Sequence, residues 1–238
     1  MKNNYIGQAW LVLVLALCFG AALAGVETWL KPKIDANKLA ATLDQIANLV
    51  PDANAAESAR IAKDPNWGPV TVAVGEGDAA GTYEAFRAMD AGARQVGWVI
   101  KASGKGFADK IELLIGLDAN AQTITGLHVL DQKETPGLGN KITVKGDPKN
   151  QGFLWQFFHH RPRADQPLAV TKASPKADEP GAANKIKAVT GATISSRSVC
   201  DIINEALSGE LRQKLAAEAK KAAAATRKAT PSTRKATP

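Results

Sequence analysis

The chain of 238 residues has few of the side chains that build metal centres and covalent cross-links. It contains two cysteines and three histidines. One cysteine, Cys18, lies in an apolar run and the other, Cys200, in a helical pattern, so both are predicted to be small apolar packing residues. His159 and His160 are adjacent and would point to different sides of a helix or strand. We therefore predict no metal site, no disulfide framework and, since no nucleophile groups with a base, no catalytic residue.

The folded part of the chain also has no large excess of positive or negative charge. The formal net charge is +7, but the segment 214–238 carries seven basic residues and one acid, which accounts for +6. The rest of the chain is close to neutral, so a nucleic-acid-binding surface is not expected. The basic segment is rich in Ala and Lys and ends in a repeated Thr-Arg-Lys-Ala-Thr-Pro, which favours disorder. An extension of the last helix over 211–225 and contact with anionic lipid are alternatives for this segment.

The N-terminal region has no charge between residues 3 and 26, and residues 9–26 are almost entirely apolar. Such a run is long enough to span a bilayer, and Trp10 and Trp29 suit its interfaces. A cleaved signal peptide is the alternative, because Ala22-Leu23-Ala24 fits a cleavage site. We predict a retained membrane anchor over 1–30, a folded domain over 31–213 and a basic, disordered tail over 214–238.

Between the predicted anchor and the predicted tail, the sequence pattern indicates mostly short strands and few helices. An amphipathic helix ends at Pro51, and strand patterns occupy 70–74, 83–89, 95–101, 111–117, 124–130 and 168–171. The two central pairs are separated by short turns and therefore form hairpins. The predicted fold class is α+β, with one N-terminal transmembrane helix followed by a twisted, mainly antiparallel sheet flanked by helices.

Two glycine-containing segments resemble nucleotide-binding loops without their full pattern. Residues 75–80 match a loose G-x-G-x-x-A, but no convincing helix follows and the acidic ribose partner is absent. Residues 103–106 lack the Lys-Ser ending of a phosphate loop and are read as a turn. Neither segment is expected to bind a nucleotide.

The segment Thr190-Gly191-Ala192-Thr193 places a hydroxyl on a turn of minimal bulk just before a helical pattern. Apolar residues recur at helical spacing over 199–207, with Gly209 as the predicted stop and Ser195 or Ser196 as the predicted cap. A helix N-terminus favours a nearby anion. A phosphodiester on the threonine would therefore lie in a favourable field.

A second motif, Lys133-Glu134-Thr135-Pro136-Gly137-Leu138-Gly139, follows a strand pattern as a tight loop of small residues. In this order and at this separation, the two motifs resemble the FMN-binding domain of the Rnf and Nqr ion-translocating electron-transport complexes. The G subunit of Rnf is the more similar, and the C subunit of Nqr is more distant. The resemblance extends from about Trp98 to Leu207 and includes one preceding membrane segment.

The resemblance implies a set of flavin-binding residues. A dedicated transferase would cleave FAD and leave FMN joined by its phosphate to Thr193. The other implied cofactor-binding residues are Thr190, Gly191 and Ala192 of the first motif, Thr135, Gly137 and Leu138 beside the ring, Phe107 as a second apolar contact, and Lys172 near the flavin N1. For Lys172, a solvated lysine at a strand end is the alternative.

The sequence departs from the family in two places. Lys187 occupies the position three residues before Thr190 where members usually carry an acid, and a transferase that needs this acid would modify Thr193 slowly. Phe107 is followed by Ala108 and Asp109 instead of the usual glycine pair, which predicts a narrower ring pocket.

The resemblance also implies a function and a location. The chain would be a subunit of a ferredoxin:NAD⁺ oxidoreductase in the cell membrane, with the domain on the extracytoplasmic side and other subunits, a flavin transferase and lipid as partners. It would relay electrons without turning over a substrate of its own. An Nqr-type NADH:quinone reductase and a membrane-anchored binding module without flavin are the alternatives.

Overall fold

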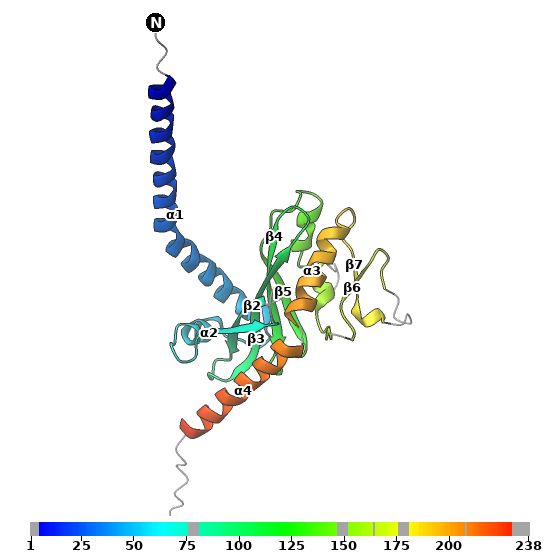
Figure 1. Ribbon diagram of the computed structural model, residues 1–238. Helices are drawn as coiled ribbons and strands as arrows, with labels where there is room; N and C mark the ends of the chain where they lie inside the picture. Colours follow the sequence, from blue (N-terminus) through cyan, green and yellow to red (C-terminus); the bar gives the residue numbers. More distant parts are fainter. Residues whose placement is uncertain are drawn as a thin grey trace, which may run out of the picture. The chain divides into compact units, whose positions relative to one another are not determined.

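The computed structural model describes residues 5–75, 81–146, 152–163, 165–175, 181–207 and 209–229. The chain divides into two units, Met1–Thr42 and Leu43–Pro238. The first consists of most of helix α1 (Tyr5–Leu49), and the second contains the last residues of α1 and the folded domain (Figure 1). The weak nucleotide-loop match at 75–80 lies almost wholly outside the described residues.

Helix α1 is the one helix in the described part that is long and apolar enough to cross a membrane. Its span Ala9–Leu49 includes a window of mean hydropathy 2.5 that is not buried by the rest of the structure. Large apolar side chains such as Leu13, Phe19 and Leu23 are exposed along it. A helix with apolar residues on all sides is stable when lipid surrounds it, which supports membrane association.

The second unit is built on a five-stranded antiparallel sheet in which each strand pairs with the next along the chain. Its strands are β1 (Val70–Val74), β2 (Gly81–Met89), β3 (Gln95–Lys105), β4 (Lys110–Asp118) and β5 (Ile124–Asp131). Both predicted hairpins are present. The predicted α+β fold with an antiparallel sheet is confirmed.

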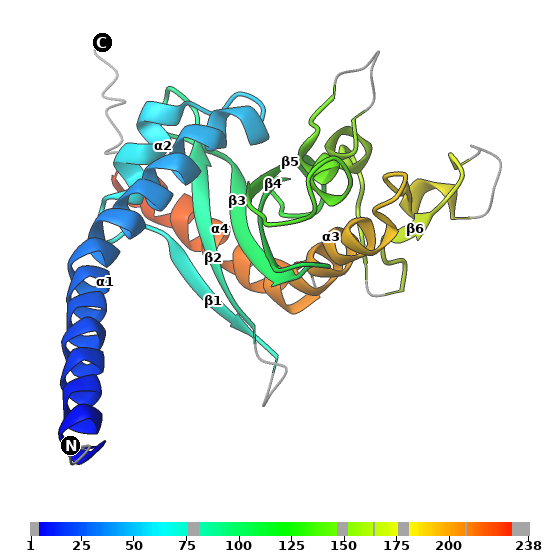
Figure 2. The ribbon, with the colours of Figure 1, turned by 90° about the horizontal axis from the view of Figure 1, so that it is seen from above.

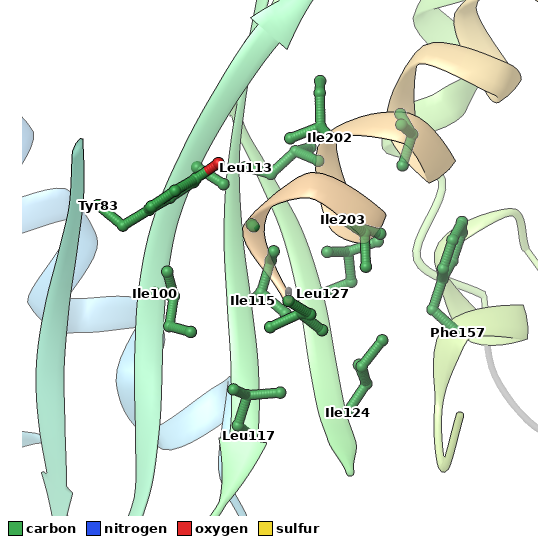
Figure 3. Packing of buried hydrophobic residues seen from close by; sticks show 14 of the residues in the cluster. Tyr83, Ile100, Leu113, Ile115, Leu117, Ile124, Leu127, Phe157, Ile202 and Ile203 are labelled. Carbon is green, nitrogen blue, oxygen red and sulfur yellow. The ribbon is translucent and has the colours of Figure 1, made fainter. Parts of the chain in front are cut away.

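Helices cover both faces of this sheet. Helix α2 (Ala55–Ala62) packs on β2, whereas α3 (Thr193–Ala206) packs on β3 and α4 (Gly209–Ala229) on β1. Figure 2 shows α2 and α3 on opposite sides of the sheet. The face toward α3 carries the larger apolar cluster, in which Ile202 and Ile203 lie over Ile100, Ile115 and neighbouring residues of the sheet (Figure 3). These four side chains are at most 5% exposed, so this cluster is the main core of the domain.

Glycines on the opposite face let the end of α1 approach the sheet backbone. A Cβ atom on Gly116 would lie 2.5 Å from the carbonyl oxygen of Leu49, and one on Gly126 would lie 2.7 Å from it. The hydroxyl of Thr125 donates a hydrogen bond to the same oxygen over 2.8 Å. The last turn of α1 is thereby fixed to β4 and β5.

Substitution of Gly116 is therefore expected to destabilise the domain. Gly116→Ala forces the backbone of Leu49 away from β4 and should lower the free energy of unfolding by about 2 kcal/mol. Guanidinium denaturation followed by tryptophan fluorescence measures this change. Gly209→Ala is the matched control, because a Cβ there meets nothing within 4 Å. Equal midpoints for the two variants would contradict the close approach of α1.

A smaller parallel sheet joins β6 (Ala169–Thr171) to β7 (Lys185–Lys187). Short 3₁₀ helices occupy Gly139–Thr143, Leu154–Phe157 and Ala182–Asn184. Strand β7 leads directly into the turn before α3, and α3 also packs on β6. The small sheet thus positions the N-terminus of α3.

Three local predictions were wrong. Residues 103–105 belong to β3 and not to a turn; Gly104 leaves room for Ile202, whose Cγ1 would lie 2.5 Å from a Cβ at that position. Gly209 does not end α3, which stops at Ala206, but begins α4. Ser195 and Ser196 lie inside α3 instead of capping it, because their hydroxyls bond to other groups.

The basic segment differs from the expected disordered tail over 214–238 but agrees with the expected helix over 211–225. Helix α4 continues to Ala229, so the expected boundary at 214 falls within a helix. Two contacts fix the start of α4 to β1: Lys214 donates to the carbonyl of Ala73 over 2.5 Å, and Glu210 accepts from the N–H of Gly75 over 3.0 Å. Residues 230–238, which hold most of the repeated motif, lie outside the described residues.

Candidate functional site

The two motifs meet at a cavity of about 440 Å³. Three segments line it: Phe107 after β3, the loop from Glu134 to Gly139 after β5, and residues 191–195 at the start of α3. Pockets that hold small molecules have volumes of roughly 300–1,000 Å³. The cavity is therefore large enough for a cofactor.

Thr193 is the first residue of α3 and lines this cavity. It is half-buried, and the residue before it, Ala192, supplies no side-chain hydrogen bond to the helix N-terminus. The first amide groups of α3 lack a capping side chain and carry the positive end of the helix dipole. An anion attached to Thr193 would be stabilised by them.

Gly191 shapes the turn that presents this threonine. The N–H of Ala192 donates to the carbonyl of Val189 over 2.9 Å, and Gly191 within the turn has a φ of 79°. A Cβ at Gly191 would also lie 2.9 Å from Cδ2 of Leu138. Glycine is needed here both for the left-handed backbone and for contact between the two motifs.

Glu134 connects all three segments of the site. It is only 4% exposed; its Oε1 accepts from the N–H groups of Phe107 (2.8 Å) and Ala108 (3.2 Å). Its Oε2 accepts from the hydroxyl of Ser195 over 2.6 Å. Hydrogen bonds to a carboxylate are about twice as strong as neutral ones. One side chain thus holds the Phe107 loop and the start of α3 against the second motif.

Ser196 fixes the same turn from the other side. Its hydroxyl accepts from the N–H of Val189 over 3.0 Å and donates to the carbonyl of Ala192 over 2.9 Å. Because Ser195 and Ser196 are both engaged in this way, neither is available to cap α3. The helix N-terminus remains open toward the cavity.

The departure from the family's glycine pair has a structural counterpart. Asp109 forms an ion pair with Lys133 at 3.1 Å, between the Phe107 loop and the second motif. Hydrogen bonds from the Lys110 N–H and from Lys133 lower the pKa of Asp109, and the Asp109 carboxylate raises the pKa of Lys133. Both side chains are largely exposed, so this pair adds little stability. The ion pair connects the Phe107 loop to the second motif, two of the segments that Glu134 also connects.

Three of the side chains that line the cavity are large, apolar and exposed. Phe107 is 61% exposed, Leu138 47% and Ile194 55%. Large apolar groups gathered at one cavity indicate a binding surface. The site therefore combines an apolar rim with the uncapped N-terminus of α3.

The structure brings six of the predicted site residues to this cavity: Phe107, Thr135, Leu138, Gly191, Ala192 and Thr193. Gly137 and Thr190 lie in the adjoining turns, exposed and outside the lining. Lys172 is an exposed residue after β6 and does not line the cavity either. Lys187, the second departure from the family, ends β7 and is also exposed.

Sequence reasoning did not assign Glu134, Gly139, Ile194 and Ser195 to the site. Glu134 and Gly139 are part of the second motif, and Ser195 was assigned as a cap. A Cβ on Gly139 would lie 2.8 Å from Glu134 and 3.0 Å from the Ser195 oxygen. The burial of Glu134 and its need for a glycine at position 139 can be recognised only in the folded structure, where the loops lie together.

Cys200 packs behind the site in α3 and is 1% exposed. Burial raises the pKa of its thiol to about 12. At pH 8, alkylation of Cys200 by iodoacetamide in a Cys18→Ser chain should be about a thousandfold slower than that of a free thiol, from the thiolate fraction alone. Mass spectrometry measures the rate, and unfolding in guanidinium should restore it. Rapid alkylation of the folded chain would contradict the packing role.

No group of three or more Cys, His, Asp or Glu side chains that could hold a metal ion occurs among the described residues. The cavity and the two motifs that line it agree with what a comparison of the chain with known proteins shows. Residues 106–208 match the FMN-binding domain family. The family resemblance predicted from the two motifs is confirmed.

Two relatives are similar to the chain over part of their length. The chain is 32% identical over 139 residues to the G subunit of an ion-translocating oxidoreductase complex of Methanosarcina acetivorans, covering 58% of this chain and 64% of that protein. It is 31% identical over 110 residues to the G subunit of the Na⁺-translocating ferredoxin:NAD⁺ oxidoreductase complex of Acetobacterium woodii, covering 46% of each. The chain thus spans about half to two thirds of these relatives.

The chain also aligns with a solved structure. The crystal structure of Shewanella oneidensis NqrC aligns with a TM-score of 0.48 and 21% identity, over 69% of this chain and 74% of that one.

Proposed function

We propose that the chain is the electron-transfer subunit of a membrane-bound ion-translocating oxidoreductase complex of the ferredoxin:NAD⁺ type, with FMN attached to Thr193 through a phosphoester. The observation that carries the proposal is the cavity itself. It joins Thr193, the open N-terminus of α3 and the loop of the second motif within an FMN-binding domain.

Each part of the cavity has a role in holding the cofactor. The Thr193 hydroxyl provides the oxygen of the ester, and the first amides of α3 stabilise the phosphate charge. Phe107, Leu138 and Ile194 provide apolar contacts for the ring, and Glu134 keeps their loops in place. FMN, when bound, accepts and donates electrons singly or in pairs.

A covalent bond to the cofactor suits a domain outside the cytoplasm, where lost FMN would not be replaced. Attachment makes rebinding intramolecular, at roughly millimolar effective concentration for a short linker. We assign the domain to the extracytoplasmic side, with α1 as anchor, and expect a flavin transferase to act during maturation. The exposed rim leaves the ring accessible to redox partners, and we expect no substrate turnover by the isolated chain.

The complex and its redox couples are inferred from the relatives. These relatives are named as subunits of ion-translocating oxidoreductase complexes, and two of the names specify a ferredoxin:NAD⁺ oxidoreductase. Genes for ferredoxin-like iron–sulfur subunits beside this one would support the Rnf type, and their absence would favour the Nqr type.

Intact mass tests the flavin. The full chain, co-expressed with its flavin transferase, should gain the mass of one FMN less one water. The denatured band should fluoresce under ultraviolet light. A dark band with only the polypeptide mass would overturn the proposal and favour a binding module without flavin.

A further inference from the structure

A second cavity lies at the junction of α3 and α4, apart from the flavin cavity. It has a volume of about 350 Å³, and none of its lining residues lines the first cavity. Its polar side chains come from three segments: Gln122 in the turn between β4 and β5, Arg163 in the loop before β6, and Arg212 and Gln213 in the first turns of α4. Gly209, the first residue of α4, completes one wall.

Arg212 is the unusual member of this group. It is 6% exposed, and its Nε and Nη2 atoms are buried without a hydrogen-bond partner in the described part of the chain. Burial lowers the pKa of its guanidinium, and the nearby charge of Arg163 lowers it further. Burying a charged group whose N–H groups lack acceptors is unfavourable unless an opposite charge joins it.

The acid whose charge acts on Arg212 does not form an ion pair with it. Asp118 attracts Arg212, but no ion pair within 4.0 Å joins them. Oδ1 of Asp118 instead accepts from the N–H groups of Gln122 (2.6 Å) and Thr123 (3.1 Å). The cavity therefore keeps a positive surplus.

Other groups add to this surplus. Arg161 does not line the cavity, but its Nε donates to the hydroxyl of Thr123, the residue after Gln122, over 2.9 Å, which brings a further positive charge to this region. The start of α4 contributes the positive end of its dipole at Gly209. The acid in its first turn, Glu210, is engaged elsewhere, with the N–H of Gly75 and with Lys214.

We propose that this cavity, defined by Arg212, Arg163 and the N-terminus of α4, binds a phosphate-bearing anion. The planar guanidinium forms paired hydrogen bonds with phosphate oxygens, and the phosphate supplies the opposite charge that Arg212 lacks. Two arginines are balanced better by a phosphate dianion than by one carboxylate. The inference does not depend on flavin attachment, since the two cavities are separate.

Phosphorus NMR and thermal unfolding test the site with the full chain in a non-ionic detergent at constant ionic strength. The probes are inorganic phosphate, short-chain phosphatidylglycerol and an acidic hexapeptide of glutamates. Phosphate should bind and raise the unfolding temperature, as a ligand of the folded state does. Phosphatidylglycerol binding more tightly than free phosphate would identify a lipid headgroup as the source; the reverse order would identify free phosphate.

Variants distinguish the cavity from general attraction to a basic chain. Arg212→Met should weaken phosphate binding by about tenfold or more, the effect of losing charged hydrogen bonds. Without phosphate it should unfold at or above the wild-type temperature, because an unpartnered buried charge is removed. Arg163→Gln, at an exposed position that cannot disturb the core, should also weaken binding.

Lys220→Gln is the matched control, because it removes one exposed charge from the same helix and should leave the affinity within about twofold. Three results would overturn the proposal: no phosphate binding by the wild type, equal weakening by Arg212→Met and Lys220→Gln, or binding of the acidic peptide alone.

Discussion

Thr193→Ala should abolish covalent flavin while leaving the domain folded. Thr193 is the half-buried hydroxyl of the first motif that lines the cavity, and alanine has no oxygen to form the ester. Its side chain makes no hydrogen bond that stabilises the described structure, so the free energy of unfolding should change by less than about 0.5 kcal/mol. In-gel fluorescence and intact mass after co-expression with the transferase measure the loss of flavin.

Thr190→Ala provides the control for this result. Thr190 belongs to the same motif and is equally able to form an ester, but it is exposed in the turn and does not line the cavity. Its replacement should leave most of the fluorescence in the band. If Thr193→Ala keeps the added mass and Thr190→Ala loses it, the assignment of the attachment site is wrong.

The effect of Lys187 can be separated from that of Thr193. Lys187 is exposed, and its backbone is held by Gln156, whose side chain both donates to and accepts from it. A change of its side chain therefore leaves the turn before α3 in place. Any slow flavin attachment in this chain would reflect recognition by the transferase and not a distorted Thr193.

The strands were predictable because they are short runs rich in apolar residues and are separated by short turns. The two hairpins from β2 to β5 follow from this local pattern. The close approach of α1 to Gly116 and Gly126 was not predictable, since it joins residues more than sixty positions apart. Gly104 was taken as a turn residue for the same reason: its partner, Ile202, is distant in the sequence.

The site shows the same division between local and distant signals. Thr193 and the loop from Thr135 to Leu138 were found through their motifs, which are contiguous in the sequence. Ser195 was assigned to the helix cap because a serine near a helix start usually caps it. Its actual partner, Glu134, lies 61 positions away, and only the folded chain brings the two side chains within 2.6 Å.

Glu134 is therefore the residue whose replacement should disturb the site most after Thr193. Glu134→Ala leaves the N–H groups of Phe107 and Ala108 and the hydroxyl of Ser195 without their buried acceptor. Unsatisfied buried groups cost about 1–3 kcal/mol each, partly recovered by water, so the free energy of unfolding should fall by about 3 kcal/mol. Guanidinium denaturation measures this loss.

The same variant should act on flavin attachment through the geometry of the loops. Without Glu134, the Phe107 loop and the start of α3 are no longer joined, and attachment should slow by about tenfold, or 1.4 kcal/mol in the barrier. Hydrogen exchange at the amides of Phe107 and Ala108 should rise before global unfolding, a change that a uniform loss of stability would not produce.

Two further variants serve as controls for the effects of Glu134→Ala. Glu134→Gln keeps an acceptor oxygen for the two N–H groups and should retain most of the stability and attachment rate. Glu205→Ala removes an exposed carboxylate from α3 and should change neither quantity. Because Glu134 holds three segments together, its loss should slow flavin attachment even in protein that remains folded. An unchanged attachment rate in folded Glu134→Ala would contradict this prediction and would mean that α3 alone positions Thr193.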